Sequence, residues 1–354
     1  MSDKFLAQKQ RYIQYWNMEN HDRPILNFRA PKPGGSWPRR EHPTLEARWT
    51  DVDFAVARFR AQAENTYCLA DALPVVYPNL GPDILGAVMG CGLEFGENTS
   101  WALHNVTDWD THPELKFDPD NRYWKIIMAI TKAALEDSNG DYIVGITDLH
   151  PGLDGLVSVR GPQELCFDLL ECPDEIHKRT EQTFEVFRTI YNTSYDILTK
   201  TQQGSSTFMG GTWHPGRWYP TSCDFSCMIS PDAFAEFVMP DLKKQLAMLD
   251  ISLYHLDGPD ALRHLDALLA IPELGGIQWV PGEGQKPQRE WTDVLQKIQA
   301  AGKRIWVHVT PEDIEPLCRA LRPEGVLFTC HFPSKEQGED MIRFVEGFYK
   351  GALN

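Results

Sequence analysis

Ile251-Ser-Leu-Tyr-His-Leu-Asp257 opens the part of the chain that decides the fold. Three more short apolar segments follow it: Gly276-Ile-Gln-Trp-Val280, Lys303-Arg-Ile-Trp-Val-His-Val309 and Gly325-Val-Leu-Phe-Thr-Cys330. A helical pattern comes after each of the four segments, at 261–270, 288–300, 311–321 and 335–349. Short apolar strands that alternate with helices in this way predict parallel strand-helix units.

The same alternation continues upstream with looser spacing. Strand candidates lie at 23–28, 69–77, 141–149 and 206–213, and helix candidates at 51–64, 123–136, 173–199 and 231–249. Eight parallel strands with interleaved helices close naturally into a barrel, because right-handed crossovers place the helices outside and closure leaves no sheet edge. We therefore expect one α/β domain over residues 1–354, a (β/α)8 TIM barrel with extended N-terminal helices and long βα loops in its first half. An open doubly wound sheet is the rival fold, but no Gly-x-Gly-x-x-Gly turn follows the first strand.

The composition argues against several classes of partner. The chain has 354 residues, with 50 acidic and 34 basic side chains and a formal net charge of -16, which disfavours binding to nucleic acid or to an anionic membrane surface. No run approaches the roughly 20 apolar residues of a membrane-spanning helix. Because the N-terminus is polar as well, we expect a soluble cytoplasmic protein. The 8 dispersed cysteines are expected to be free thiols.

Titratable residues gather at the predicted strand ends, where a barrel of this kind carries its chemistry. The nominated acid or base groups are Asp148, His150, Glu283 and His308. Asp148 and His150 lie in a stretch rich in Asp, Pro and Gly, so turn formation is the alternative for them. For His308, a satisfied core position is the alternative.

Aromatic and polar residues at the same ends are candidates for substrate binding. They are Arg29, Tyr77, Trp213, His214, Trp218, Tyr219 and Trp279. Tryptophan side chains can wall a pocket for a flat or methylated ligand by stacking or by cation-π attraction. The alternative for the aromatic residues is packing between loops.

A metal site is indicated by one strand and a distant cysteine. His255 and Asp257 are two residues apart in a predicted strand, so their side chains point to the same face. If closure of the barrel brings the eighth strand alongside, Cys330 completes a set of three ligands with an open fourth position, which is typical of catalytic zinc. The alternative is a hydrogen-bonded core histidine, and the outcome depends on strand register.

The N-terminal segment carries a resemblance to a known superfamily. Gln10-Arg-Tyr-Ile-Gln-Tyr-Trp-Asn-Met-Glu-Asn-His-Asp-Arg-Pro-Ile25 resembles the start of the uroporphyrinogen decarboxylase superfamily, where a helix and an Asp-Arg-Pro turn lead into the first barrel strand. The eight-unit layout and the late cysteine are also similar. The decarboxylase branch needs no cofactor and has an Arg-Gln-Ala-Gly-Arg-Tyr motif, which Asn27-Phe-Arg-Ala-Pro-Lys-Pro-Gly-Gly35 lacks.

The resemblance is greater to the other branch, the methyltransferases that work with a corrinoid protein. These enzymes bind zinc through a His-x-Cys pair on strand five and a cysteine near strand eight. His255 and Cys330 fall on matching positions, with Asp257 in place of the middle cysteine. The resemblance thus implies a zinc-dependent transfer of a methyl group between a small methylated substrate or thiol and methylcobalamin carried on a separate corrinoid protein. It also implies a homodimer.

Two further hypotheses stand beside the zinc methyltransferase. The first is a cofactor-free decarboxylase or lyase for a small carboxylic acid, with Arg29 holding the carboxylate and Asp148 or His308 donating the proton. The second is a non-catalytic barrel that binds a small ligand or a partner. Chelation separates the two enzymes, because only the methyltransferase needs a metal.

Overall fold

The computed structural model describes residues 5–351 and shows a mixed α/β fold. Its strands are β1 (Ile25–Pro31), β2 (Thr66–Ala70), β3 (Val75–Val76), β4 (Gly92–Phe95), β5 (Ser100–Leu103), β6 (Ile143–Val144), β7 (Thr221–Ser222), β8 (Leu253–Asp257), β9 (Gly276–Val280), β10 (Arg304–His308) and β11 (Val326–His331). Its α-helices are α1 (Leu6–Trp16), α2 (Leu45–Thr50), α3 (Val52–Asn65), α4 (Ile84–Val88), α5 (Arg122–Ser138), α6 (Leu153–Arg160), α7 (Pro162–Glu171), α8 (Pro173–Gln202), α9 (Pro231–Ala233), α10 (Met239–Met248), α11 (Leu265–Leu269), α12 (Thr292–Ala300), α13 (Pro311–Ala320) and α14 (Lys335–Tyr349).

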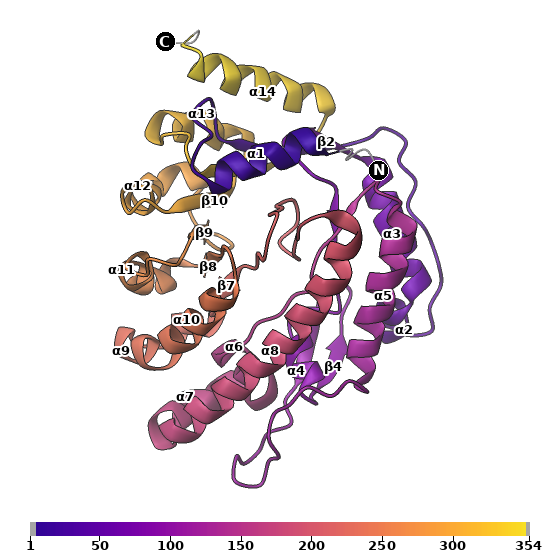
Figure 1. Cartoon of the computed structure of the whole chain (residues 1–354), viewed down its shortest axis with the longest axis vertical. Helices are drawn as coiled ribbons and strands as arrows, with labels where there is room; N and C mark the ends of the chain where they lie inside the picture. Colours follow the sequence, from indigo (N-terminus) through magenta and orange to yellow (C-terminus); the bar gives the residue numbers. More distant parts are fainter. Residues whose placement is uncertain (1–4, 352–354) are drawn as a thin grey trace.

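A seven-stranded sheet organises the chain, in the order β2-β1-β11-β10-β9-β8-β7. All its neighbours are parallel except β2, which runs antiparallel to β1. Figure 1 shows α10, α11, α12 and α13 following one another along the outer side of these strands. The sheet is compatible with a TIM-like fold. Within residues 5–351, however, the hydrogen-bonded ladders do not join into a closed ring, because β3 and β6 form a separate two-stranded parallel piece.

The four strand-helix units predicted for the second half are confirmed. The strands β8 to β11 and the helices α11 to α14 lie within or close to the predicted segments. Thr310 and Asp313 form a capping box at the start of α13, with Pro311 in the first turn, so local sequence sets where this helix begins.

Two strand predictions in the first half are wrong. The expected strand 69–77 is split into β2 and β3, because the chain turns at Ala70, which has a φ of 50°, and the Asp71 carboxylate binds the backbone N–H of Leu26. The expected strand 206–213 forms only single bridges, from Thr207 to Ile146 and between residues 205 and 214. Its backbone is bound by α1 instead, since Trp16 donates a hydrogen bond to the carbonyl of Trp213 at 2.7 Å.

The two faces of the sheet pack against different layers. Leu253, Trp306 and Leu327 belong to a core with Tyr15 and Trp16 of α1. The intervening strand residues belong to a larger core shared with the outer helices, which includes Ile277, Val307 and Phe328 as well as Ile298 of α12 and Leu317 of α13. Side chains alternate between faces along a strand, so this division tells which residues share the face toward α1.

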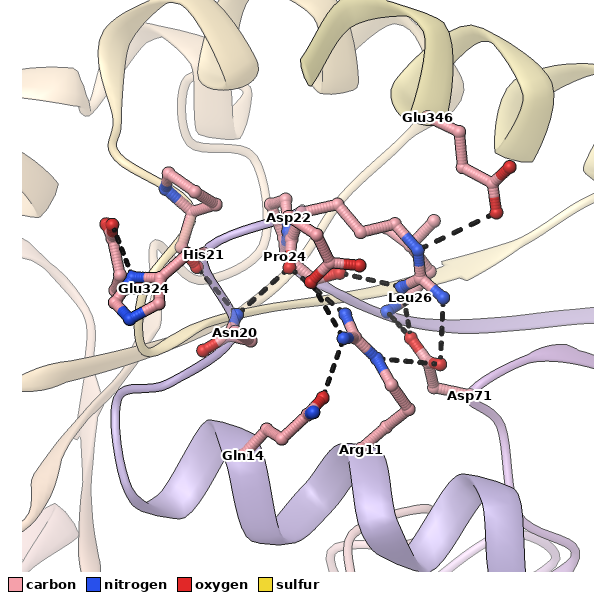
Figure 2. A network of polar contacts seen from close by, with 12 residues as sticks. Arg11, Gln14, Asn20, His21, Asp22, Pro24, Leu26, Asp71, Glu324 and Glu346 are labelled. Atoms are coloured by element: carbon pink, nitrogen blue, oxygen red, sulfur yellow. Dashed lines mark hydrogen bonds and ion pairs between the residues drawn. The ribbon is translucent and has the colours of Figure 1, made fainter. Parts of the chain in front are cut away.

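The Asp22-Arg23-Pro24 turn ties α1, β1 and α14 together, and Figure 2 shows the contacts. Asp71 is only 2% exposed and accepts hydrogen bonds from Arg23 and from the amide of Leu26. Arg11 of α1 lies 3.5 Å from the same carboxylate and binds Asp22 at 2.8 Å. A buried carboxylate is stable only when it is paired, so this cluster fixes the N-terminal segment on the sheet.

The length and hydropathy of the helices bear on the expectation that the chain has no membrane-spanning helix. Along residues 5–351, no helix is both long enough and apolar enough to cross a membrane, and this includes the 30-residue α8.

Candidate functional site

The C-terminal ends of the parallel strands bring titratable side chains together on the face toward α1. His255 of β8 binds Gln278 of β9 at 2.6 Å, and Asn27 of β1 donates to the Thr329 hydroxyl of β11 at 3.2 Å. We call this end of the sheet, with the adjoining loops, the mouth; it comprises Arg29, Asp148, His150, Asp154, Ser222, Asp224, His255, Asp257, Gln278, His308 and His331. Such an end is where strand-helix folds place their chemistry.

His255 and Asp257 share one face of β8, as the sequence spacing predicted. The Nδ1 of His255 lies 2.6 Å from the side-chain amide oxygen of Gln278. An amide oxygen can only accept a hydrogen bond, so Nδ1 is the donor and Nε2 is the ring nitrogen left for another partner. This Nε2 lies 4.0 Å from the Asp224 carboxylate. Burial raises the pKa of Asp257; His255 opposes the rise and Asp224 adds to it.

His150 is held between carboxylates in the loop after β6. Its Nε2 lies 2.7 Å from Asp148, and its Nδ1 lies 2.8 Å from the Ser222 hydroxyl and 3.9 Å from Asp154. Burial lowers the pKa of His150, but Asp148, Asp224 and Asp154 outweigh this effect and raise it to about 10. The two nominated residues therefore contact each other at the mouth.

Asp154 and Asp224 lie next to each other although 70 residues separate them in sequence. The two carboxylate oxygens of Asp154 accept the backbone N–H groups of Asp224 and Phe225, each at 2.9 Å, at the start of a 3-10 turn over Asp224–Met228. Burial and the neighbouring Asp224 raise the pKa of Asp154 to about 6, although His150 and the two amides oppose the rise. Two neighbouring carboxylates repel each other when both are charged, and a cation bound between them would offset this repulsion.

The structure does not bring Cys330 to His255, and the expected set of three zinc ligands is not assembled. Thr329 points toward Asn27 and Trp306 on the face of the mouth, so the next residue, Cys330, points to the other face. There Cys330 packs in the core under the outer helices. Burial raises the pKa of its thiol to about 12, and the charged groups that contribute are Glu312 and Asp313.

The expected aromatic wall is also not assembled, because four of the five nominated residues are buried in the protein and the fifth, His214, is half-buried. None of them lines either of the two cavities beside the mouth: Trp213, His214, Trp218, Tyr219 and Trp279. The two loop tryptophans share a core with α1, and the remaining tryptophan belongs to the core under the outer helices. The tyrosine hydroxyl donates to the carbonyl of Thr147 at 2.7 Å. Packing, the alternative given above, accounts for these residues.

Arg29 and Tyr77, which were nominated for substrate binding, both line cavities. A cavity of about 380 Å³ is lined by Arg29, Lys32 and His331 among others, and an adjoining one of about 420 Å³ by Arg29, Arg58 and Tyr77. Arg29 donates a hydrogen bond to the carbonyl of Leu73 at 3.0 Å and makes no ion pair with any residue between 5 and 351. Its charge is therefore available to an anionic ligand.

The two remaining acid-base nominations differ in their surroundings. His308 reaches the mouth, where burial and the nearby His331, Arg29 and His255 lower its pKa to about 4, so its imidazole is neutral near pH 7. Glu283 is exposed on the loop after β9 and lines neither cavity.

Sequence reasoning missed three of the residues that build the mouth. Asp224 lies between two cysteines in a segment interpreted only as a loop, and Ser222 precedes it. Gln278 stands in the middle of an apolar strand, and this single polar residue was an available signal. Asp154 lies four residues after His150, in the same stretch rich in Asp, Pro and Gly, and the structure places its carboxylate 3.9 Å from that histidine.

Comparison with solved structures places the fold. The chain matches a methyltransferase from Methanosarcina mazei with a TM-score of 0.64, over 97% of this chain and 99% of that chain, at 13% sequence identity. This likeness shows a shared fold over nearly the whole length. No family model and none of the curated proteins matches the sequence.

Proposed function

We propose that this protein is a methyltransferase that moves a methyl group between a small thiol or methylated substrate and a corrinoid carried on a separate protein. One observation carries the proposal: the fold is shared over nearly its full length with a methyltransferase. The mouth supports it, because titratable side chains from separate segments meet there. The proposal includes closure of the sheet into a (β/α)8 barrel around this mouth.

The side chains of the mouth suit transfer to a thiol. The corrinoid supplies the methyl group, and the new carbon–sulfur bond forms as the cobalt–carbon bond breaks with its electron pair left on cobalt. The thiol proton must go to the protein, and the Asp257 carboxylate is exposed at the mouth beside His255, where it can accept that proton. Arg29 faces the adjoining cavities and would hold an anionic end of the substrate.

The test is methyl transfer from methylcobalamin to a panel of small thiols, followed by the absorbance change of the corrinoid. We expect turnover by the purified protein and a fall in kcat of about 100-fold or more in Asp257→Asn, the scale of a lost general base. Asp260→Asn is the matched control, since this carboxylate is exposed in the following turn and contacts only Arg263. Absence of transfer across thiols and methylated donors, in metal-supplemented protein, would refute the proposal.

A carboxy-lyase is the second candidate, and the unpaired Arg29 at two cavities favours it. Such an enzyme would release CO₂ from a small acid without a cofactor, so its activity would survive chelation. Arg29→Gln would then raise KM at least about tenfold, because a guanidinium-carboxylate contact is lost. CO₂ release that is absent for every small acid tested removes this candidate.

A further inference from the structure

Two segments that are distant in sequence, 150–154 and the turn at Asp224, place metal-ligating atoms within reach of one ion. One ligand atom each from His150, Asp154 and Asp224 lies within 4.8 Å of the other two. The neighbouring strand adds His255, whose Nε2 is 4.0 Å from Asp224. The three mutually close residues offer one imidazole and two carboxylates, and His255 at the end of β8 adds a second imidazole beside Asp224.

Each imidazole of this set has one ring nitrogen beside an orienting partner and the other close to a carboxylate of the set. Nε2 of His150 lies 2.7 Å from Asp148, and Nδ1 lies 2.8 Å from the Ser222 hydroxyl and 3.9 Å from Asp154, so a metal at Nδ1 would replace the ring proton and the hydrogen bond with Ser222. The Gln278 carbonyl oxygen accepts from Nδ1 of His255, so Nε2 keeps its lone pair on the side of Asp224. Metal-bound histidines almost always have such a hydrogen-bond partner.

The carboxylates are positioned just as firmly. The backbone N–H groups of Asp224 and Phe225 hold the two oxygens of Asp154, and each oxygen retains a second lone pair. Asp224 is 54% exposed, so it offers a ligand from the solvent side of the mouth and leaves room for a water or substrate atom. An ion at this point would offset the repulsion between the two acids.

We propose that His150, Asp154, Asp224 and His255 form a binding site for one divalent transition-metal ion, of the zinc type. Imidazole and carboxylate together suit zinc, and cobalt(II) is a chemically similar substitute. The site differs from the His255, Asp257 and Cys330 set that the sequence suggested, since it keeps only the histidine. A metal here would lower the pKa of a bound thiol or water. The inference rests on the proposed methyl transfer for the use of the metal, whereas the binding itself is independent of it.

The test is metal content and metal affinity of the full-length protein after chelation and reloading with zinc or cobalt(II). We expect about one ion per chain and, for cobalt(II), visible absorption bands of a four- or five-coordinate site. Asp224→Asn and His255→Gln should each weaken zinc binding at least tenfold, and Asp148→Asn, which alters only the orienting partner, by about 10- to 100-fold. Asp224 is half exposed, so its variant is expected to fold even if the histidine variant does not, and thermal unfolding reports on both.

Two controls separate this site from the one predicted by sequence. Cys330→Ala and Asp260→Asn should bind zinc as tightly as the wild type, because neither side chain reaches the ligands. Wild-type protein that binds no ion after reloading would overturn the inference. So would loss of binding in Cys330→Ala together with unchanged binding in Asp224→Asn. Stoichiometric binding without methyl transfer would sink only the proposed function, and methyl transfer by protein shown to bind no metal would sink only the metal site.

Discussion

The halves of the chain before and after residue 250 differ in how they form the mouth. From β8 to α14, strands of five or six residues alternate with helices, and their ladders leave little choice of geometry. Before β8, the parallel pieces β3, β6 and β7 have two residues each, and loops connect them. The irregular half supplies His150, Asp154 and Asp224, whereas the regular half supplies His255. The irregular half thus contributes its part of the mouth through specific side-chain contacts more than through regular ladders.

The buried ion-pair cluster that fixes the N-terminal segment on the sheet can be broken most directly at Asp71, and this substitution should have the largest effect. Asp71→Ala leaves the guanidinium groups of Arg11 and Arg23 without their buried counter-ion. We expect the free energy of unfolding to fall by about 3–5 kcal/mol, measured by urea denaturation.

Asp22→Ala is the control for this prediction. Asp22 is 64% exposed and pairs with Arg11 at the surface, so its loss should change stability by no more than about 1 kcal/mol. Equal effects of the two substitutions would show that the buried cluster does not fix the N-terminal segment on the sheet.

Asp241 lies in α10, just before the boundary between the halves at residue 250. Its burial leads us to expect that the stability of the protein depends on pH. Asp241 is 6% exposed, and burial raises its pKa to about 7; nearby Asp154 adds to the rise and the hydrogen bond from Gln245 opposes it. The unfolded carboxyl ionises near pH 4 but the folded one stays protonated until about pH 7, so stability should fall as pH rises through this interval. The total change is up to about 4 kcal/mol.

Asp241→Asn removes this titration. The variant should be more stable than the wild type at pH 8, and the difference should shrink toward pH 4, as followed by urea unfolding at several pH values. Asp232→Asn, at an exposed site in α9, is the control and should leave the wild-type profile in place. Parallel profiles for wild type and Asp241→Asn would contradict the prediction.

Within the regular half, the buried hydroxyl of Thr329 should matter less. It accepts hydrogen bonds from Trp306 at 2.9 Å and from Asn27 at 3.2 Å. Thr329→Val keeps the shape but leaves two buried donors without an acceptor, so we expect a loss of about 2 kcal/mol in unfolding free energy. Thr193→Val, on the exposed side of α8, should stay within about 0.5 kcal/mol. If Thr329→Val lowers the unfolding free energy no more than the Thr193→Val control does, the sheet tolerates the loss of these hydrogen bonds even in its regular half.

The sequence predicted the regular half well because its signals are local. The alternation of apolar segments and helical patterns marked β8 to β11, and the Thr310-Pro311 pair marked the start of α13. The same approach failed at 69–77 and 206–213, since Asp71 and the loop near Trp213 are held by contacts with segments far away in sequence. Long-range contacts leave no periodic trace in the sequence.

The candidate site shows the same division between features set by local sequence and features set by long-range contacts. The sequence by itself determined that His255 and Asp257 share a face, because the strand period of two residues is fixed by the backbone. Only the tertiary structure decided which face of β11 that site would meet, and the register placed Thr329 on it and turned Cys330 toward the helices. It also decided that Asp154 and Asp224 meet beside His150, because that juxtaposition depends on two loops packed against each other. Local geometry is set by covalent periodicity, whereas the assembly of a site from distant segments is set by packing.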